Sequence, residues 1–222
     1  MLKLVFKLLI LSAFFIPDDN FELLNKLKDN KNWKLVDIKT DSIRVYEKQI
    51  ADMDLKALKV EKIINFNPDL ILETVMDINK YPEIMSNSDI TSSIIGQRNN
   101  MIYAYNHFPA PFPFIEDRHY IFRIKKISST EINWSLVDYL EVKSTLRLKT
   151  IIDNNSSAIY LDYGAGLWEI NPLTENLTQV SYALYMDSGG SLSYNLNDLF
   201  TSQSILNLYQ SVLDESNERS KQ

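Results

Sequence analysis

The 222-residue chain has no cysteine and only two histidines, His107 and His119. Disulfides, thiolate metal sites, iron–sulfur clusters and cysteine nucleophiles are therefore excluded. The chain also lacks a basic stripe, since 23 Lys and Arg stand against 29 Asp and Glu, with a net charge of -6. Because nucleic-acid binding depends on clustered Lys and Arg, we expect no nucleic-acid partner. We likewise expect no metal and no cofactor.

Common catalytic signatures are missing too. Gly189-Gly190 is not followed by the Gly-Lys-Ser/Thr of a phosphate loop, and no Gly-x-Ser-x-Gly elbow is present. Glu116 and Asp117 are adjacent, so their carboxylates diverge and make a poor acid–base pair. We therefore predict no catalytic residue.

The N-terminal segment 1–17 has the pattern of a secretory signal. Lys3 and Lys7 precede the apolar run 8–16, which Pro17 ends abruptly. The run is shorter than the roughly 20 apolar residues of a transmembrane helix. We expect export to the periplasm or the extracellular space. No clear Ala-x-Ala cleavage site precedes Asp18, so an uncleaved membrane anchor stays an alternative.

The remaining length suits one domain with a sizeable core. Apolar spacing predicts a helix over 21–28, and Asn67-Pro68-Asp69 starts a helix over 70–77. Alternating and β-branched runs predict strands at 42–48, 55–64, 89–95, 101–108, 120–127, 132–142, 145–152, 158–170 and 177–186.

The stretch 140–149 alternates leucine or valine with charged residues, apart from a break near Ser144. This alternation indicates a sheet with one covered and one wet face.

The last part of the chain is predicted to be one long amphipathic helix. Its apolar stripe comprises Leu196, Leu199, Phe200, Leu206, Tyr209, Val212 and Leu213. A curved sheet must cover its concave face, and only this helix is long enough to do so. We therefore expect an α+β fold in which a curved antiparallel sheet wraps around a long C-terminal helix. Sheet and helix would enclose either a packed core or a ligand cavity.

Several short motifs follow one another along the chain in the same order as in one known protein family. They are Trp33 before 43–46, Asp77 to Tyr81-Pro82, Pro111-Phe112-Pro113-Phe114 with Asp117-Arg118, Gly166-Leu167-Trp168, and Asp187-Ser188-Gly189-Gly190. On these residues the chain resembles the StAR-related lipid-transfer (START) family of the helix-grip superfamily. The resemblance covers a domain over 20–216, followed by a polar tail at 217–222. His119 replaces an acid of the family pattern, and the acid–arginine pair of some sterol-binding members has no counterpart.

The resemblance implies an elongated pocket lined by aromatic and apolar side chains, although the same side chains could simply fill a core. The candidate ligand-binding residues are Tyr103, Tyr105, His107, Tyr120, Phe122, Trp134, Tyr182, Tyr185, Leu199 and Leu206.

Three further groups of residues have an expected role or position. Asp117-Arg118 is expected to be a structural pair that fixes a turn, with ligand gripping as the alternative. Alternation places His119 opposite Tyr120 and Phe122, facing solvent. Gly189-Gly190 is predicted to be a hinge before the last helix.

The expected function is non-catalytic binding of a lipid or other hydrophobic small molecule, with transfer of that molecule as an extension of binding. We expect a monomer with a transient membrane contact. One alternative is a polyketide cyclase or aromatase, which would need a polar pocket holding His107, Arg123 or Arg147. The other is an interaction module of the cell envelope, which would need a filled interior.

Overall fold

A computed structural model describes residues 19–51, 53–110, 115–187, 189 and 194–222. The predicted signal segment 1–17 and Pro111-Phe112-Pro113-Phe114 lie outside these residues. One curved sheet runs in the order β1-β2-β3-β10-β9-β7-β6-β5-β4, with β8 paired to β6. The strands are β1 (Lys34–Ile38), β2 (Arg44–Gln49), β3 (Lys56–Ile64), β4 (Thr91–Arg98), β5 (Met101–Phe108), β6 (Arg118–Lys126), β7 (Glu131–Leu136), β8 (Ile159–Tyr160), β9 (Gly164–Pro172) and β10 (Thr178–Met186).

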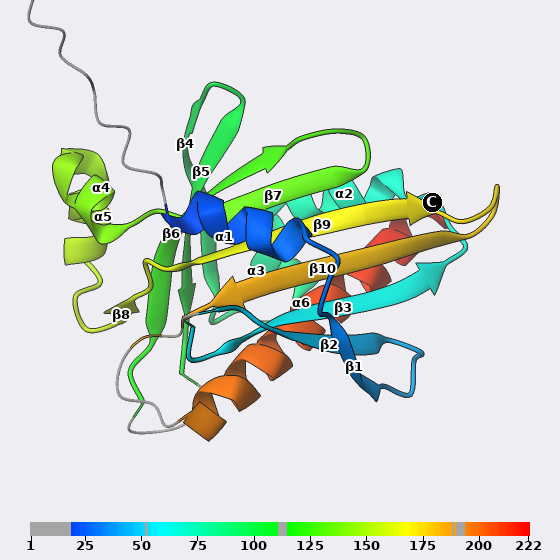
Figure 1. Cartoon of the computed structure of the whole chain (residues 1–222). Coiled ribbons are helices and arrows are strands. Elements are labelled where there is room, and N and C mark those ends of the chain that lie inside the picture. The colour runs from blue at the N-terminus through cyan, green and yellow to red at the C-terminus, as the bar shows by residue number, and fades with distance from the viewer. Residues whose placement is uncertain (1–18, 52, 111–114, 188, 190–193) are drawn as a thin grey trace, which may run out of the picture.

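Apart from the short parallel β6–β8 pair, neighbouring strands are antiparallel. The helices are α1 (Asp19–Lys28), α2 (Asp69–Met76), the 3-10 turn η1 (Ile78–Lys80), α3 (Tyr81–Ile84), α4 (Tyr139–Ser144), α5 (Leu146–Asp153) and α6 (Tyr194–Arg219). Figure 1 shows α6 on one face of the sheet and α1 on the other. The predicted fold class, a curved antiparallel sheet around a long C-terminal helix, is confirmed.

Helix α6 packs its apolar stripe into the concave face of the sheet. Ile205, Tyr209, Val212 and Leu213 are buried there, in the main hydrophobic cluster. The Tyr209 hydroxyl also donates a hydrogen bond of 2.7 Å to the Val180 carbonyl of β10. The far end of α6 is held as well, because the Arg219 guanidinium lies 2.8 Å from the Asp77 carboxylate. The helix thus continues into the predicted polar tail.

The outer face of the sheet is covered in two places, the first of them by α1. Leu23, Leu24 and Leu27 are buried against the small side chains Ala165 and Ala183. Small residues on a strand let a helix approach closely, which explains why this contact forms. Asn20, at the start of α1, ties the helix down: its Nδ2 donates to the carbonyls of Leu136 and Asp162, at 3.1 and 3.0 Å.

The second cover is formed by α4 and α5, which we call the α4–α5 insertion. The strand predicted over 132–142 ends at Leu136, and the strand predicted over 145–152 is wrong, since residues 139–153 are mostly helical. Asp138 caps α4 by accepting a hydrogen bond of 2.9 Å from the Glu141 amide, a contact specific to a helix start. The predicted break near Ser144 exists, but it separates two helices. Val142 and Ile152 cover Ile121 on the outer face of β6. This face was expected to be exposed to solvent, but it is covered.

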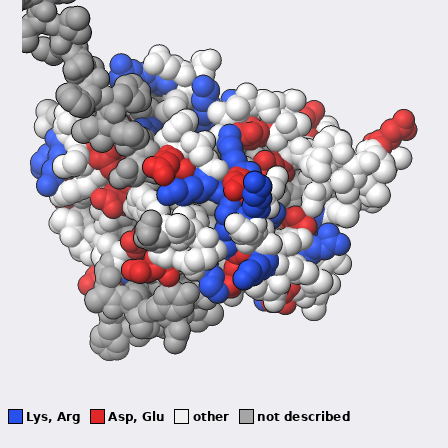
Figure 2. All heavy atoms as spheres, in the orientation of Figure 1, with Lys and Arg blue, Asp and Glu red and all other residues white. Residues whose placement is uncertain are grey.

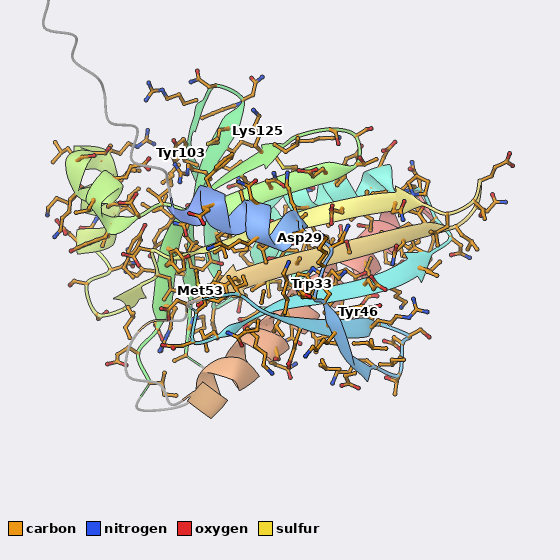
Figure 3. The ribbon with its side chains drawn as sticks, viewed as in Figure 1. Asp29, Trp33, Tyr46, Met53, Tyr103 and Lys125 are labelled. Carbon is orange, nitrogen blue, oxygen red and sulfur yellow. The ribbon has the colours of Figure 1, made fainter. Side chains whose placement is uncertain are left out.

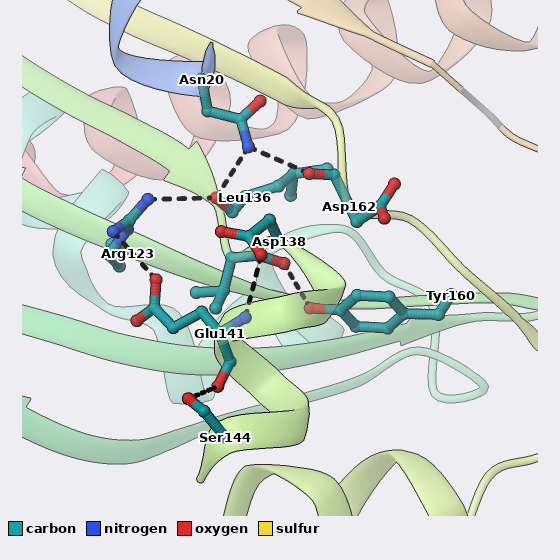
Figure 4. Close-up of polar contacts among 9 residues, drawn as sticks. Asn20, Arg123, Leu136, Asp138, Glu141, Ser144, Tyr160 and Asp162 are labelled. Carbon is teal, nitrogen blue, oxygen red and sulfur yellow. Dashed lines mark hydrogen bonds and ion pairs between the residues drawn. The ribbon is translucent and has the colours of Figure 1, made fainter. Parts of the chain in front are cut away.

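Figure 4 shows the polar contacts that hold α4 to the sheet. The Arg123 guanidinium of β6 lies 3.3 Å from the Glu141 carboxylate. On the other side, the Tyr160 hydroxyl of β8 donates to the Val137 carbonyl at 2.6 Å. Tyr160 belongs to β8, which is separate from β9, so the single strand predicted over 158–170 is corrected to two.

Lys, Arg, Asp and Glu side chains are intermixed over the face shown in Figure 2. Within the described ranges, no helix is long and apolar enough to cross a membrane.

Candidate functional site

A cavity of about 360 Å³ lies between the concave face of the sheet and α6. This volume falls within the roughly 300–1,000 Å³ of small-molecule sites. Its walls are mostly apolar and come from β5, β6, β7, β9, β10, α6 and the α2–α3 region. The cavity reaches the surface beside α6, where the lining residues Gln203, Ser204 and Asn207 are exposed.

Four of the predicted ligand-binding residues line this cavity: Tyr120, Phe122, Trp134 and Tyr182. Strand alternation places Tyr120 and Phe122 on the concave face of β6, and the sheet register brings Trp134 and Tyr182 to the same face. Tyr182 stacks on Trp168, which also lines the cavity, with ring centroids 4.3 Å apart. Whether these residues bind a ligand stays a prediction.

Three tyrosines, Tyr81, Tyr120 and Tyr182, are among the polar residues that line the cavity. The Tyr81 hydroxyl donates to the Val75 carbonyl at 2.7 Å, and the Tyr120 hydroxyl accepts from the Asn106 amide at 3.3 Å. The Tyr182 hydroxyl is hydrogen-bonded to the Trp134 indole. Burial raises the pKa of Tyr120 to about 12 and also raises the pKa of Tyr81 and Tyr182. All three phenols therefore stay neutral at physiological pH, and the proton of Tyr81 is already donated to Val75.

Tyr103, Tyr105 and His107 are placed outside the cavity, which corrects the expectation that they line it. They sit on the outer face of β5, because the register pairs Tyr105 with Ile121 and His107 with His119. Tyr105 is buried there in the cluster under the α4–α5 insertion. Figure 3 shows Tyr103 near the end of the β4–β5 hairpin that lies away from α6.

Two of the other three predicted residues, Tyr185 and Leu206, are not among the described residues that line the cavity. Tyr185 is on the outer face of β10, in the cluster under α1. Leu206 packs against the main core from α6 but does not line the cavity. Leu199 belongs to α6, but its side chain is outside the described part of the structure.

His119 does not face solvent, contrary to the expectation. It points to the outer face as alternation predicts, but the α4–α5 insertion and β8 cover that face, leaving it 1 % exposed. Its Nδ1 lies 3.3 Å from the Tyr105 hydroxyl, and its ring meets Tyr160 edge-on. Burial, with a smaller effect of His107, lowers the pKa of His119 to about 4. The ring is therefore neutral and structural in this setting.

Asp117, directly before β6, and Arg118, the first residue of β6, point to opposite faces of the sheet. Asp117 Oδ1 accepts from the Ala110 amide at 2.8 Å, and its Oδ2 lies 3.2 Å from His107 Nε2. These contacts brace the β5–β6 connection, in keeping with a structural role for Asp117. Arg118 lies on the concave face and lines the cavity, while its guanidinium donates to the Glu116 carbonyl.

The predicted hinge is described in part. Gly189 has φ 61°, and a Cβ there would lie 3.1 Å from the Ile159 side chain, so glycine is favoured at this position. Gly190 lies outside the described residues. A hinge role stays a prediction.

The residues that a cyclase was expected to need do not line the cavity. Arg123 is on the outer face with Glu141, and Arg147 is an exposed residue of α5. Among the described lining residues, the ionisable side chains are Arg118 and the three tyrosines. In the same part of the chain no cluster of His, Asp and Glu is suited to a metal ion.

Sequence reasoning missed Arg118, Asn106 and Tyr81 as cavity residues. A signal for Arg118 was present, because it stands two positions before Tyr120 on the same strand and must share its face. Asn106 could not be found in this way, since aromatic residues occur on both faces of β5.

No family model and no curated protein sequence matches this chain. Solved structures match its fold. A STAR-related lipid transfer protein from Xanthomonas axonopodis superposes with a TM-score of 0.66 at 17% identity, covering 84% of this chain and 99% of that one. Human StAR-related lipid transfer protein 5 gives a TM-score of 0.62 at 16% identity, covering 89% and 92%. The Zhui aromatase/cyclase from Streptomyces gives 0.51 at 13% identity, covering 73% and 94%. The chain therefore has a START-like helix-grip fold.

Proposed function

We propose that this protein binds a lipid or another hydrophobic molecule in the cavity between the sheet and α6, without performing chemistry on it. The observation that carries the proposal is the cavity itself, with its apolar walls and a few neutral phenols. Burying apolar surface there contributes about 25 cal/mol per Å², while the phenols orient polar groups of the ligand. The similarity in fold to two proteins named for lipid transfer supports this assignment.

A cyclase or aromatase is the second candidate, because one structural neighbour is an aromatase/cyclase. General acid–base catalysis needs a group that titrates near neutral pH. The described cavity wall offers only Arg118 and phenols whose pKa is raised, so we favour binding over catalysis. An interaction module of the cell envelope would need a filled interior. The cavity therefore makes this third alternative less favoured than binding.

The binding proposal is tested by incubating the full chain with a lipid extract and recording a native mass spectrum. We expect a bound species in the wild type. Leu184→Trp adds an indole to the buried cavity wall and should abolish it. Leu140→Trp, the same change at an exposed site on α4, is the control and should leave binding intact. Apo protein in every spectrum, with no uptake from the extract, would reject the proposal.

We further propose that the protein contacts membranes through the α4–α5 insertion, which lies at one end of the molecule (Figure 1). Leu140 and Leu146 are 78% and 81% exposed, the highest fractions of any large apolar side chain in the described part. Lys143 and Arg147 are exposed beside them. Exposed leucines next to basic residues suit the interface of an anionic bilayer.

Sedimentation with vesicles of phosphatidylcholine and phosphatidylglycerol tests this contact. The double change Leu140→Asp and Leu146→Asp should release the protein from the vesicles. The matched change Leu173→Asp and Leu177→Asp, at the β9–β10 turn, should not. Equal binding by both variants would show that another surface makes the contact.

Export through segment 1–17 remains a proposal as well. Fractionation of cells expressing the full chain, followed by N-terminal sequencing, distinguishes a cleaved signal from an uncleaved anchor. Retention of the intact chain in the cytoplasm would contradict both. We also propose a monomer, which light scattering of the purified chain would check.

A further inference from the structure

The Tyr120 hydroxyl is the last member of a chain of hydrogen bonds that ends in the cavity. The Ser92 hydroxyl donates to Asn106 Oδ1 at 2.6 Å, and Asn106 Nδ2 donates to the Tyr120 hydroxyl at 3.3 Å. Asn106 is buried and lines the cavity together with Tyr120. Because the phenol oxygen accepts here, its own proton remains to be donated, and no described residue accepts it. An unpaired donor in an apolar wall costs free energy, so the site favours a ligand that supplies an acceptor.

The position of this hydroxyl is fixed before any ligand enters. The Tyr120 ring stacks on Phe108 with centroids 5.9 Å apart and meets Phe122 edge-on at 5.8 Å. Both phenylalanines belong to strands of the same sheet, β5 and β6. A donor that is already oriented binds an acceptor without a further loss of side-chain freedom.

The other two tyrosines of the wall are less suited to hold the polar end of a ligand. The proton of Tyr81 is already donated to the Val75 carbonyl. Tyr182 is hydrogen-bonded to the Trp134 indole, but it is buried, whereas Tyr120 is partly exposed. The polar end of an amphiphile stays nearest to water, so Tyr120 is the donor that it would meet.

The charge beside Tyr120 does not call for an anionic ligand. The Arg118 guanidinium donates a hydrogen bond to the Glu116 carbonyl, and the charges of Glu116 and Asp117 both act on it. A carboxylate entering the cavity would lose its hydration and meet a cation whose charge is already offset. A neutral acceptor avoids this cost.

We propose that the cavity takes a neutral amphiphile whose polar end is a carbonyl oxygen, that of a ketone or an ester, bound by the Tyr120 hydroxyl with the hydrocarbon part against Trp134 and Trp168. This inference rests on the proposed lipid-binding function and specifies its ligand class. A carbonyl fits because it accepts a hydrogen bond without bringing a proton that would need an acceptor of its own in the apolar wall.

The experiment compares three probes of eleven carbons: methyl nonyl ketone, undecane and undecanoate. Their binding to the full chain is measured by displacement of the neutral fluorescent probe N-phenyl-naphthylamine. We expect the wild type to bind the ketone, and to bind undecanoate more weakly than the ketone.

Tyr120→Phe keeps the ring and removes the hydroxyl, but it frees the Asn106 amide to donate in its place. The double variant Asn106→Leu and Tyr120→Phe removes both donors. It should weaken ketone binding about tenfold, the equivalent of one net hydrogen bond, and leave undecane binding unchanged. Tyr209→Phe is the control, because this buried phenol is not among the described lining residues and donates to Val180. It should bind the ketone as the wild type does.

Infrared difference spectra give a readout that a purely structural role of Tyr120 would not change. With the ketone labelled at its carbonyl carbon, the bound carbonyl should absorb at lower frequency than in hexane, because it accepts a hydrogen bond. In the double variant it should absorb as in hexane. If melting shows that the double variant is unfolded, Tyr120→Phe alone should still weaken ketone binding at least about twofold.

The outcomes separate the two proposals. The headgroup assignment is wrong, while lipid binding stands, if undecanoate binds more tightly than the ketone. The same conclusion follows if the double variant keeps the full affinity for the ketone, or if the bound carbonyl absorbs as in hexane in the wild type. If none of the three probes binds, the proposed function itself fails.

Discussion

Replacing Gly166 by alanine tests how closely the cavity wall is packed. Gly166 lies on β9 opposite Trp134 of β7, and the indole covers the place where a side chain would be. A Cβ at this position would lie 2.7 Å from Trp134 Cε2 and 2.8 Å from the Ala183 carbonyl oxygen. The absence of a side chain at Gly166 therefore allows Trp134 to line the cavity.

The size of the effect follows from these distances. Carbon atoms in contact are normally at least about 3.5 Å apart, so Trp134 would have to move by about 0.8 Å. The backbone oxygen of Ala183 cannot move aside as a flexible side chain would. Overpacking of this kind costs about 1–3 kcal/mol, and alanine regains about 0.4–1 kcal/mol by restricting the unfolded chain. A net loss of about 1–2 kcal/mol lowers Tm by about 2–8 °C in a chain of this length.

Scanning calorimetry of the full chain measures this change. The control is Gly96→Ala on the edge strand β4, where no atom lies within 4 Å of the new Cβ. This variant should melt at the same temperature as the wild type or slightly above it. The packing argument is refuted if Gly166→Ala melts with the wild type, or if Gly96→Ala falls as far.

Three further predictions concern buried polar groups. Asn20→Ala removes the side chain that holds α1 to Leu136 and Asp162, and urea unfolding should show a loss of about 2–4 kcal/mol. Tyr209→Phe deletes the hydrogen bond to the Val180 carbonyl, and the same assay should show a loss of about 1 kcal/mol. Because burial lowers the pKa of His119 to about 4, the unfolded chain binds a proton more readily between pH 6.5 and 4. Stability should therefore fall as pH falls through this window, and less steeply in His119→Phe; identical pH profiles would contradict the assignment.

The fold class could be predicted because the strands and the last helix each leave a clear hydrophobic pattern in the sequence. The strands β3, β5 and β10 and the apolar stripe of α6 were each predicted close to their observed bounds. The α4–α5 insertion was missed because 140–149 alternates with period two although it is helical. Leucine, lysine, arginine and glutamate are all good helix formers, and Asp138 supplies a helix cap. Periodicity alone cannot decide such a short segment.

That one misassignment carried over to the site. With 132–142 and 145–152 taken as strands, no element was expected to cover the outer face of β6, so His119 was placed in solvent. The alternation of side chains along β6 was predicted correctly, so Tyr120 and Phe122 were correctly expected to face the cavity. The face of β5 could not be assigned from sequence, because it carries aromatic or amide side chains on both sides. Only the pairing of Tyr105 with Ile121 decides it.

The contacts of Asn20 also bear on the order in which the chain folds. They join the first described helix to residues 116 and 142 positions further along the sequence. During synthesis, α1 therefore has no docking site until β7 and the segment leading into β9 have emerged. The N-terminal end of the domain docks late and stays accessible while most of the chain is being made. A truncation series should show a sharp limit at Asn20, before which residues can be removed without releasing α1 from the sheet.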